Sequence, residues 1–213
     1  MIPIDPQPEP AEFDTRVRQK GRAWLQKKEL SLNEPLPVGT ELPAYWQGWC
    51  LQELHRAYGG ICAYLGVYVE QVVGGATVDH YLSKKAHPGL AYEWTNYRFS
   101  SAVMNSRKGE ETDVLDPFTL APDLFHLDLL TGAIRPRIDE DHPLFSAVRA
   151  TIERLRLDEE NCRKLRRKFY LDYRAGMPLA LLRRDAPFVY QEAVRQGRLT
   201  GSVGASSVSS GRG

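Results

Sequence analysis

The feature that most constrains the fold is the run over residues 75–109, GATVDHYLSKKAHPGLAYEWTNYRFSSAVMNSRKG. Within it, the β-branched pair before the acidic and imidazole side chains favours a strand over residues 77–80. The aromatic stretch 94–99 favours a returning strand. Ser100 or Ser101 then supplies a suitable N-cap for a helix. The predicted order is therefore strand, long loop, strand and helix.

Apolar periodicity and breaker residues predict the remaining elements. Helices are expected over 13–30, 45–58, 142–176 and 178–196, the last with a break near Pro187. A strand or hairpin is expected over 61–69, and a short strand at 72–73. A hairpin is expected over 115–136, with its turn at 131–132. The Pro-rich residues 1–12 are expected to be extended, and the Ser/Gly-rich tail 200–213 to be disordered. The sequence thus predicts an α+β fold, with one domain over 13–199 and its core at 60–110.

The amino-acid composition is typical of a globular protein but does not indicate which partner it binds. With 213 residues and 42% hydrophobic content, the chain can bury a sizeable core. We expect a cytoplasmic protein with no membrane contact, because no apolar run reaches the length of a bilayer span and the first residues lack a secretory signal. Three widely separated cysteines argue against a disulfide framework. The net charge of +1 gives no overall bias toward nucleic acid.

The central run carries residues suited to phosphodiester hydrolysis. An imidazole such as His80 can accept a proton from water near neutral pH, and the Asp79 carboxylate and an Asn carbonyl are ligands that hard divalent cations prefer. One such cation can stabilise charge on the phosphoryl oxygens and on the leaving oxygen. Adjacent strand residues point to opposite faces, so we expect a bend or bulge that lets Asp79 and His80 serve one site.

This pattern resembles the HNH endonuclease family, whose ββα-metal fold is a hairpin followed by a helix. The resemblance implies that His80 is the general base, and that Asp79 and Asn105 bind a divalent metal, Mg²⁺ or alternatively Mn²⁺. It implies that Asn96 braces the loop that presents His80. The basic residues expected near the nucleic-acid backbone are Lys84, Lys85, Arg107 and Lys108.

The resemblance extends to one HNH subgroup over about residues 40–140. The segment 87–98, HPGLAYEWTNYR, looks like that of the HNH component of Septu-type anti-phage systems and related stand-alone bacterial proteins. This likeness implies a role in antiviral defence, with an ATPase or another defence-system subunit as a partner. DNA is the expected substrate, with RNA as the weaker alternative. The sequence contains no recognisable DNA-reading module beside the central run, so we expect cleavage without strong sequence specificity.

One departure from these relatives concerns structural zinc. Many of them carry two CxxC pairs, four thiolates that bind the ion. Here the corresponding positions hold Cys62, Leu65, Ser101 and Met104. One thiolate cannot bind zinc tetrahedrally, and Leu and Met are residues that fill a core. We therefore expect no structural zinc, with Cys62, Leu65 and Met104 packed together instead.

Alternative interpretations accompany the nuclease hypothesis. A protein can keep the HNH scaffold and bind nucleic acid or a partner without turnover. The basic cluster over 163–168 is interpreted as a solvated helix face paired with the acidic residues 158–160, in preference to a DNA contact. The remaining histidines lack ligand-like spacing and are expected in surface or capping roles: His55, His87, His126 and His142.

Overall fold

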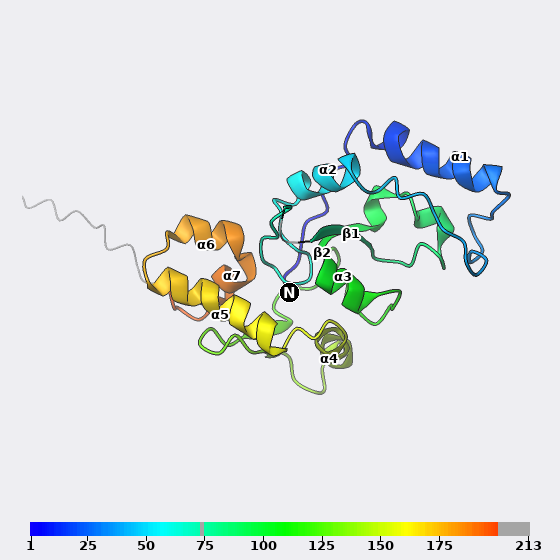
Figure 1. Cartoon of the computed structure of the whole chain (residues 1–213). Helices are drawn as coiled ribbons and strands as arrows, with labels where there is room; N and C mark the ends of the chain where they lie inside the picture. The colour runs from blue at the N-terminus through cyan, green and yellow to red at the C-terminus, as the bar shows by residue number, and fades with distance from the viewer. Residues whose placement is uncertain (73–74, 200–213) are drawn as a thin grey trace, which may run out of the picture.

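A computed structural model describes residues 1–72 and 75–199 of the chain (Figure 1). The helices are α1 (Gln19–Lys27), α2 (Trp49–Ala57), α3 (Ala102–Lys108), α4 (Phe145–Arg154), α5 (Glu160–Arg174), α6 (Leu179–Asp185) and α7 (Pro187–Arg195). The strands are β1 (Ala76–His80), β2 (Tyr97–Ser101), β3 (Phe125–Leu127) and β4 (Ile134–Pro136). Helices thus surround two small antiparallel hairpins, an arrangement of the α+β kind.

The first hairpin and the helix after it confirm the predicted order of elements in the central run. Strands β1 and β2 pair antiparallel, with Asp79 opposite Arg98 and His80 opposite Tyr97. Helix α3 begins directly after β2, where the Ser101 hydroxyl accepts a hydrogen bond from the Met104 amide at 3.3 Å. This N-cap satisfies one of the free amides of the first turn. The start of α3 is therefore fixed against the end of β2.

The N-terminal residues lie along the middle of the molecule rather than outside it. Residues 1–10 form no helix or strand, and Met1 and Ile2 are buried in the hydrophobic core. The Ile4 amide donates to the Pro117 carbonyl at 2.9 Å, and the Trp94 indole donates to the Gln7 carbonyl at 2.9 Å. In Figure 1 this segment lies between the part that carries α1, α2 and α3 and the part that carries α5, α6 and α7.

The predicted helix over 13–30 is present but shorter. A π-helical turn over Asp14–Arg18 leads into α1, and Phe13, Val17 and Leu25 are buried. Gly21 permits close packing of this helix, because a Cβ at that position would lie 2.1 Å from the Tyr92 ring. Helix α2 ends before the glycine pair 59–60, in agreement with the predicted helix over 45–58.

The C-terminal elements follow the predicted pattern closely. Strands β3 and β4 form the predicted hairpin around its turn at 131–132, whereas the helix predicted over 142–176 divides into α4 and α5, with residues 155–159 between them. The helix predicted over 178–196 divides into α6 and α7 at Ala186, directly before Pro187. The break has a steric cause, since proline disfavours the α conformation of the residue before it.

Three strand predictions need correction. Residues 61–69 form a tight loop with one isolated bridge, between Ile61 and Tyr68, rather than regular strands. Val72 is exposed in a turn, and residue 73 lies outside the described part, as does the predicted disordered tail 200–213. The returning strand begins at Tyr97 because residues 94–96 form a 3₁₀ turn that directs Asn96 into the preceding loop. None of the helices in residues 1–72 and 75–199 has both the length and the apolar character of a membrane span.

Candidate active site

The free edge of β1 forms one wall of a polar cavity of about 190 Å³. Asp79, His80 and Asn105 all line it, so the three groups proposed to act together share one cavity. The pairing of β1 with β2 runs without interruption through both Asp79 and His80, so the expected bend or bulge is absent. The two side chains have different partners, as expected for opposite faces of a strand: Asp79 contacts Tyr64 and Lys108, and His80 packs against Trp46 and Tyr97.

His80 is held in one orientation inside the protein. Its ring packs edge-on against Trp46, with centroids 4.6 Å apart, and against Tyr97, at 5.0 Å. Nε2 lies 2.9 Å from the Ala91 carbonyl oxygen. Because a carbonyl can only accept, Nε2 carries the proton and Nδ1 of the neutral ring keeps its lone pair. Nδ1 has no hydrogen-bond partner in the described residues and is not sealed from solvent, so it is free to accept a proton.

The electrostatic surroundings keep His80 neutral. Burial lowers the pKa of His80 to about 3, and the nearby Lys84 ammonium lowers it further than the Ala91 carbonyl raises it. Desolvation disfavours the charged imidazolium, and like charges act in the same direction. The imidazole therefore occupies the basic form throughout the neutral pH range.

The Asp79 carboxylate is buried away from solvent, and each of its oxygens has a protein partner. Its side chain is 1% exposed, Oδ1 lies 3.3 Å from Lys108 Nζ, and Oδ2 accepts a short hydrogen bond from the Tyr64 hydroxyl. Burial raises the pKa of Asp79, while Lys108 and Tyr64 act in the opposite direction. An ion pair in such a dry environment stays together because either partner alone would be costly to bury.

Asn105 presents an oxygen to the same cavity. From α3, its Nδ2 donates to Thr77 Oγ1 and to the Val78 carbonyl, both at 3.3 Å, and Oδ1 is left without a protein partner in the described residues. Carboxylate and amide oxygens suit a hard divalent cation. The described part of the chain has no cluster of three or more His, Cys, Asp or Glu side chains arranged for a metal. The donor set thus fits an ion that keeps several water or phosphate oxygens, as Mg²⁺ does.

Asn96 lies behind the cavity and ties the loop between the strands together. Its Oδ1 accepts from the Leu82 amide at 2.8 Å, while Nδ2 donates to the carbonyls of Leu82 at 3.0 Å and Leu90 at 3.1 Å. Loop 81–91 also contains the Ala91 carbonyl that orients His80. Asn96 therefore acts on the geometry of the base without contacting the cavity.

The basic residues predicted near a nucleic-acid backbone separate into three environments. Lys84 lines the cavity with its ammonium 5.5 Å from the centre of the Trp46 ring, and Lys85 is exposed and paired with Glu110 at 2.9 Å. Arg107 lines a different groove, and its guanidinium pairs with Glu159. Lys108 is fully buried, so the surface contact predicted for it does not fit its position. Its aliphatic stem can be buried only because its ammonium is paired with Asp79.

Several residues of the site carried no recognisable signal in the sequence. Tyr64 reaches Asp79 from the loop after α2, and Trp46 supports the His80 ring from the segment before α2. Gln47, Ser83 and Glu110 complete the lining of the cavity. These positions come from four separate segments, and no short motif links them. Only the positions of Ser83, inside the central run, and of Glu110, directly after it, indicated that these two residues could belong to the site.

No protein-family model matches the chain, and no curated protein matches it either. The geometry of the site and the motif in the central run therefore carry the functional interpretation.

The four positions compared with zinc ligands in the sequence are all buried: Cys62, Leu65, Ser101 and Met104. Cys62 Sγ accepts a hydrogen bond from the Ser101 amide at 3.5 Å, and Cys62, Leu65 and Met104 belong to one cluster of buried residues. Direct packing of these three side chains against one another stays a prediction. The cluster joins the loop after α2 to the start of α3.

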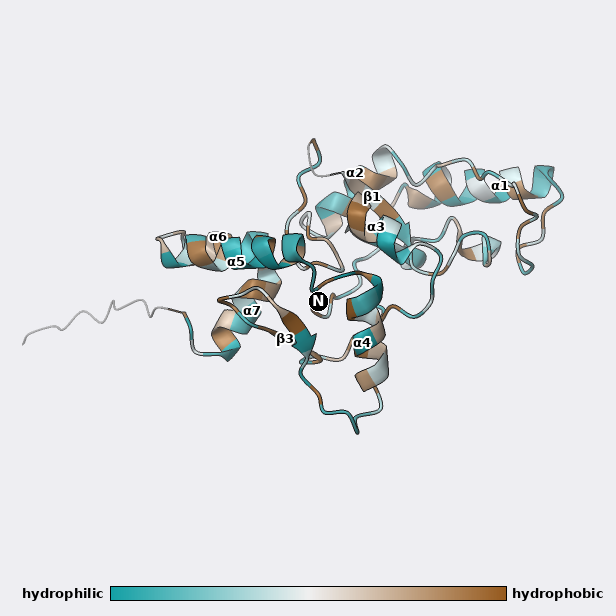
Figure 2. Cartoon of the chain, turned by 60° about the horizontal axis from the view of Figure 1, so that its bottom comes forward, coloured by the Kyte–Doolittle hydropathy of each residue, from teal (hydrophilic) through white to brown (hydrophobic). Residues whose placement is uncertain are grey.

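The basic cluster over 163–168 shows the expected pairing. Arg163 pairs with Asp158, and Lys164 pairs with Glu160 at 2.6 Å. Arg166 differs, because it is buried and donates to the carbonyls of Gly132 at 3.0 Å and of Leu157. Figure 2 shows α5 as a largely hydrophilic helix, in keeping with a solvated face.

The other histidines also have local roles, with one correction. His142 Nδ1 accepts from the Leu144 amide at 3.1 Å, a capping contact before α4, and His126 lies 2.9 Å from the Arg195 guanidinium. The surface role predicted for His55 is wrong. Its ring packs against Tyr68 and Phe99, and its Nε2 is buried without a partner in the described residues.

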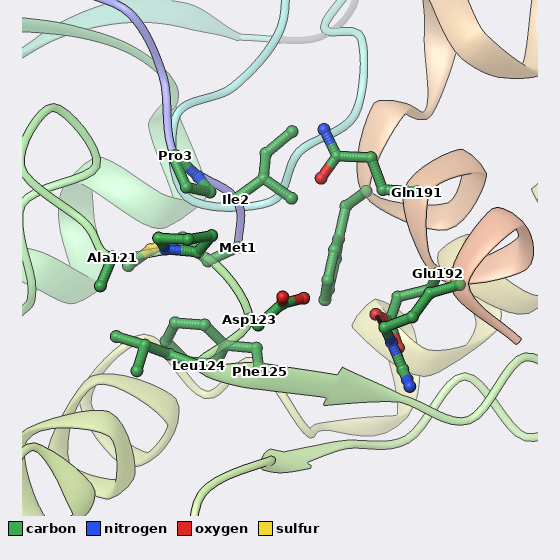
Figure 3. A pocket seen from close by; sticks show the side chains of 12 residues that line it. Met1, Ile2, Pro3, Ala121, Asp123, Leu124, Phe125, Gln191 and Glu192 are labelled. Atoms are coloured by element: carbon green, nitrogen blue, oxygen red, sulfur yellow. Dashed lines mark hydrogen bonds and ion pairs between the residues drawn. The ribbon is translucent and has the colours of Figure 1, made fainter.

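A second cavity lies between the N-terminus, β3 and α7 (Figure 3). Met1, Ile2 and Phe125 form its apolar side, and Glu192 borders it from α7. Glu192 is already engaged, because its carboxylate accepts from the Leu127 amide at 2.9 Å and from Arg195. The cavity therefore marks the junction of the N-terminal segment with the C-terminal helices.

The buried neutral imidazole predicts a pH-dependent stability. Below pH 6.5 the unfolded chain protonates His80, whereas the folded protein resists protonation until about pH 3. The unfolded state then binds more protons, so stability is lost as the pH falls through this window. At pH 4.5, we expect His80 alone to cost about 2 to 3 kcal/mol of unfolding free energy. Urea unfolding in EDTA at several pH values measures the loss.

His80→Gln is the control for this measurement, because glutamine does not titrate. The variant is expected to lose less stability between pH 6.5 and pH 4.5 than the parent protein does. Parallel stability curves for the two proteins would show that His80 does not resist protonation.

Proposed function

We propose that the protein is a divalent-metal-dependent HNH endonuclease that hydrolyses phosphodiester bonds in DNA. One observation carries the proposal: a neutral imidazole with a free Nδ1 and an unpaired amide oxygen line one cavity at the edge of β1, and Asp79, whose carboxylate is buried, belongs to the same lining. A hydrolytic site for phosphodiesters needs a proton acceptor for water and oxygen ligands for a hard cation. His80, Asp79 and Asn105 supply these groups.

The local fold supports this assignment. Strands β1 and β2 form an antiparallel hairpin, and α3 follows and packs against both strands. This is the order expected for a ββα-metal core, with the base on the first strand and an amide ligand on the helix. Asn96 occupies the loop-bracing position that the resemblance implied, with three hydrogen bonds to loop 82–90.

In the proposed mechanism, His80 Nδ1 accepts a proton from a water whose oxygen forms a bond to phosphorus, while the bond from phosphorus to the leaving ester oxygen breaks and that oxygen takes a proton from solvent. Its Nε2–H stays bonded to the Ala91 carbonyl, which fixes the reactive tautomer. The negative charge of a bound phosphodiester opposes the effect of Lys84 and raises the basicity of His80. Asp79 and Asn105 would hold a divalent ion, which would supply charge neutralisation at the phosphoryl oxygens and at the leaving oxygen. Lys84, at the cavity wall, contacts the phosphate backbone.

The biological setting follows from the resemblance to Septu-type HNH components. We infer a role in antiviral defence in the bacterial cytoplasm, in association with an ATPase or another defence-system subunit. DNA is preferred over RNA as the substrate. The exposed Lys85 next to Lys84 extends the basic surface away from the cavity, as a backbone contact requires.

A second candidate function is an HNH scaffold that binds nucleic acid or a partner without turnover. One observation favours it: both oxygens of Asp79 already have partners, in Lys108 and Tyr64. If those contacts persist, Asp79 is not available to an ion. Metal-dependent cleavage distinguishes the two candidates.

Plasmid nicking tests the proposed function. Supercoiled DNA is expected to be nicked in Mg²⁺ or Mn²⁺ and to remain intact in EDTA. Asn105→Ala removes a metal ligand and should lower the rate at least as much as the roughly 10- to 100-fold that loss of a ligand's supporting partner costs. Asn161→Ala, on the exposed face of α5, is the matched control and should nick like the parent.

The result also decides between the two candidates. Nicking in EDTA, or equal rates for the parent and Asn105→Ala, would contradict the proposed site. DNA binding without nicking by the parent would favour the scaffold function. Competition with a single-stranded RNA of the same sequence tests the preference for DNA.

A further inference from the structure

Lys108 is the most unusual charged residue of the described chain, because it is fully buried beside the proposed metal site. Its ammonium lies 3.3 Å from Asp79 Oδ1 and donates to the His80 carbonyl at 3.0 Å. It also lies 5.7 Å from the centre of the Tyr81 ring. The stem crosses from the end of α3 to the end of β1, so the charge is fixed in place.

The charges around the cavity cancel. Asp79 is the buried carboxylate of the site, and Lys108 neutralises it. Glu110 lines the cavity but pairs with Lys85, while Lys84 adds a positive charge at the wall. His80 and Asn105 are neutral. A divalent cation that approaches these groups therefore meets no net negative charge and is repelled by an ammonium close to its own ligand.

This balance changes when a nucleic acid binds. Each phosphodiester carries one negative charge, and at the scissile position its oxygens would face the same ion. We propose that Lys108 keeps affinity for a divalent cation low in the free protein, so that the ion is held tightly only together with a phosphodiester. Lys108 is thus a positioning residue that couples cation binding to substrate binding. This inference rests on the proposed function, because it takes Asp79 and Asn105 as the ligands.

Cation affinity in the absence of DNA is the first test. Mn²⁺ binding is measured by titration calorimetry for the parent, Lys108→Met and Lys108→Arg. Methionine keeps the length of the side chain and removes its charge, so we expect affinity to rise by roughly tenfold or more. Arginine keeps the charge, and its affinity should stay near that of the parent. Equal or weaker Mn²⁺ binding by Lys108→Met than by the parent would overturn the inference.

The second test needs no change at Lys108. In a His80→Ala background that prevents turnover, Mn²⁺ affinity is measured with a short phosphodiester duplex and with the same duplex made of uncharged methylphosphonate linkages. The charged duplex should raise Mn²⁺ affinity by roughly tenfold or more relative to the uncharged one. Equal affinities would overturn the inference even if Lys108→Met fails to fold.

Asp79→Asn separates failure of this inference from failure of the proposed function. Loss of Mn²⁺ binding in that variant places the ion at the proposed site. Binding that survives the change places the ion elsewhere and overturns both ideas. Where Asp79→Asn abolishes binding and Lys108→Met does not strengthen it, only the coupling role of Lys108 fails.

Discussion

His80→Ala is expected to lower the rate of plasmid nicking by about 10²- to 10⁴-fold, the range that removal of a general base produces. The free Nδ1 is the proton acceptor that the cavity offers to a water beside Asn105. Alanine at this position leaves a water without a base and also removes the ring from its packing against Trp46. The rate is measured under single-turnover conditions at saturating Mg²⁺.

The control for this prediction lies in the same loop region. His87 is exposed, and within residues 1–72 and 75–199 its imidazole forms no hydrogen bond, ion pair or ring contact. His87→Ala should therefore nick at the parental rate. Unfolding curves for both variants separate loss of the base from loss of the fold. A folded His80→Ala protein with parental activity would remove His80 from the catalytic role.

The sequence was sufficient for the elements whose signals are local. Alternation and capping residues placed β1, the start of α3 and the β3–β4 hairpin, and Pro187 placed the break between α6 and α7. These features depend on backbone preferences within a few residues. The strand expected over 61–69 failed because its β-branched residues fill the core from a tight loop, where burial and not pairing selects them.

The site itself was only partly predictable. The central run contains Asp79, His80 and Asn105, and the structure places all three at one cavity. The partners that set their chemistry come from distant segments, such as Tyr64 on Asp79 and Trp46 on His80. Contacts of this kind arise from tertiary packing, so no residue spacing in the sequence predicts them.

Lys108 illustrates the limit most clearly. In the sequence it stands in a basic run after Asn105, where a solvated position near phosphate is the natural expectation. Its position on α3 instead directs it inward, while the neighbouring Arg107 pairs with the partly exposed Glu159. Consecutive helix residues are about 100° apart around the axis, so two adjacent basic residues cannot share one face. Helical rotation thus decides which of them meets solvent.

Asn96→Ala is expected to destabilise the protein by about 2 to 4 kcal/mol, because it leaves buried backbone groups without partners. The asparagine is buried and satisfies the Leu82 amide and the carbonyls of Leu82 and Leu90. A methyl group replaces none of these bonds, and the loop that contains Ala91 loses its brace. Nicking should fall as well, since the Ala91 carbonyl orients His80.

Two further variants test the physical reason for this effect. Asn96→Asp keeps an acceptor for the Leu82 amide but sets a carboxylate against two carbonyl oxygens, so it should also destabilise the protein. Asn33→Ala, at an exposed loop position, should change stability by no more than about 0.5 kcal/mol. Urea unfolding at neutral pH measures all three. If Asn96→Ala unfolds like Asn33→Ala, the loop is held by backbone contacts alone and Asn96 does not brace the base.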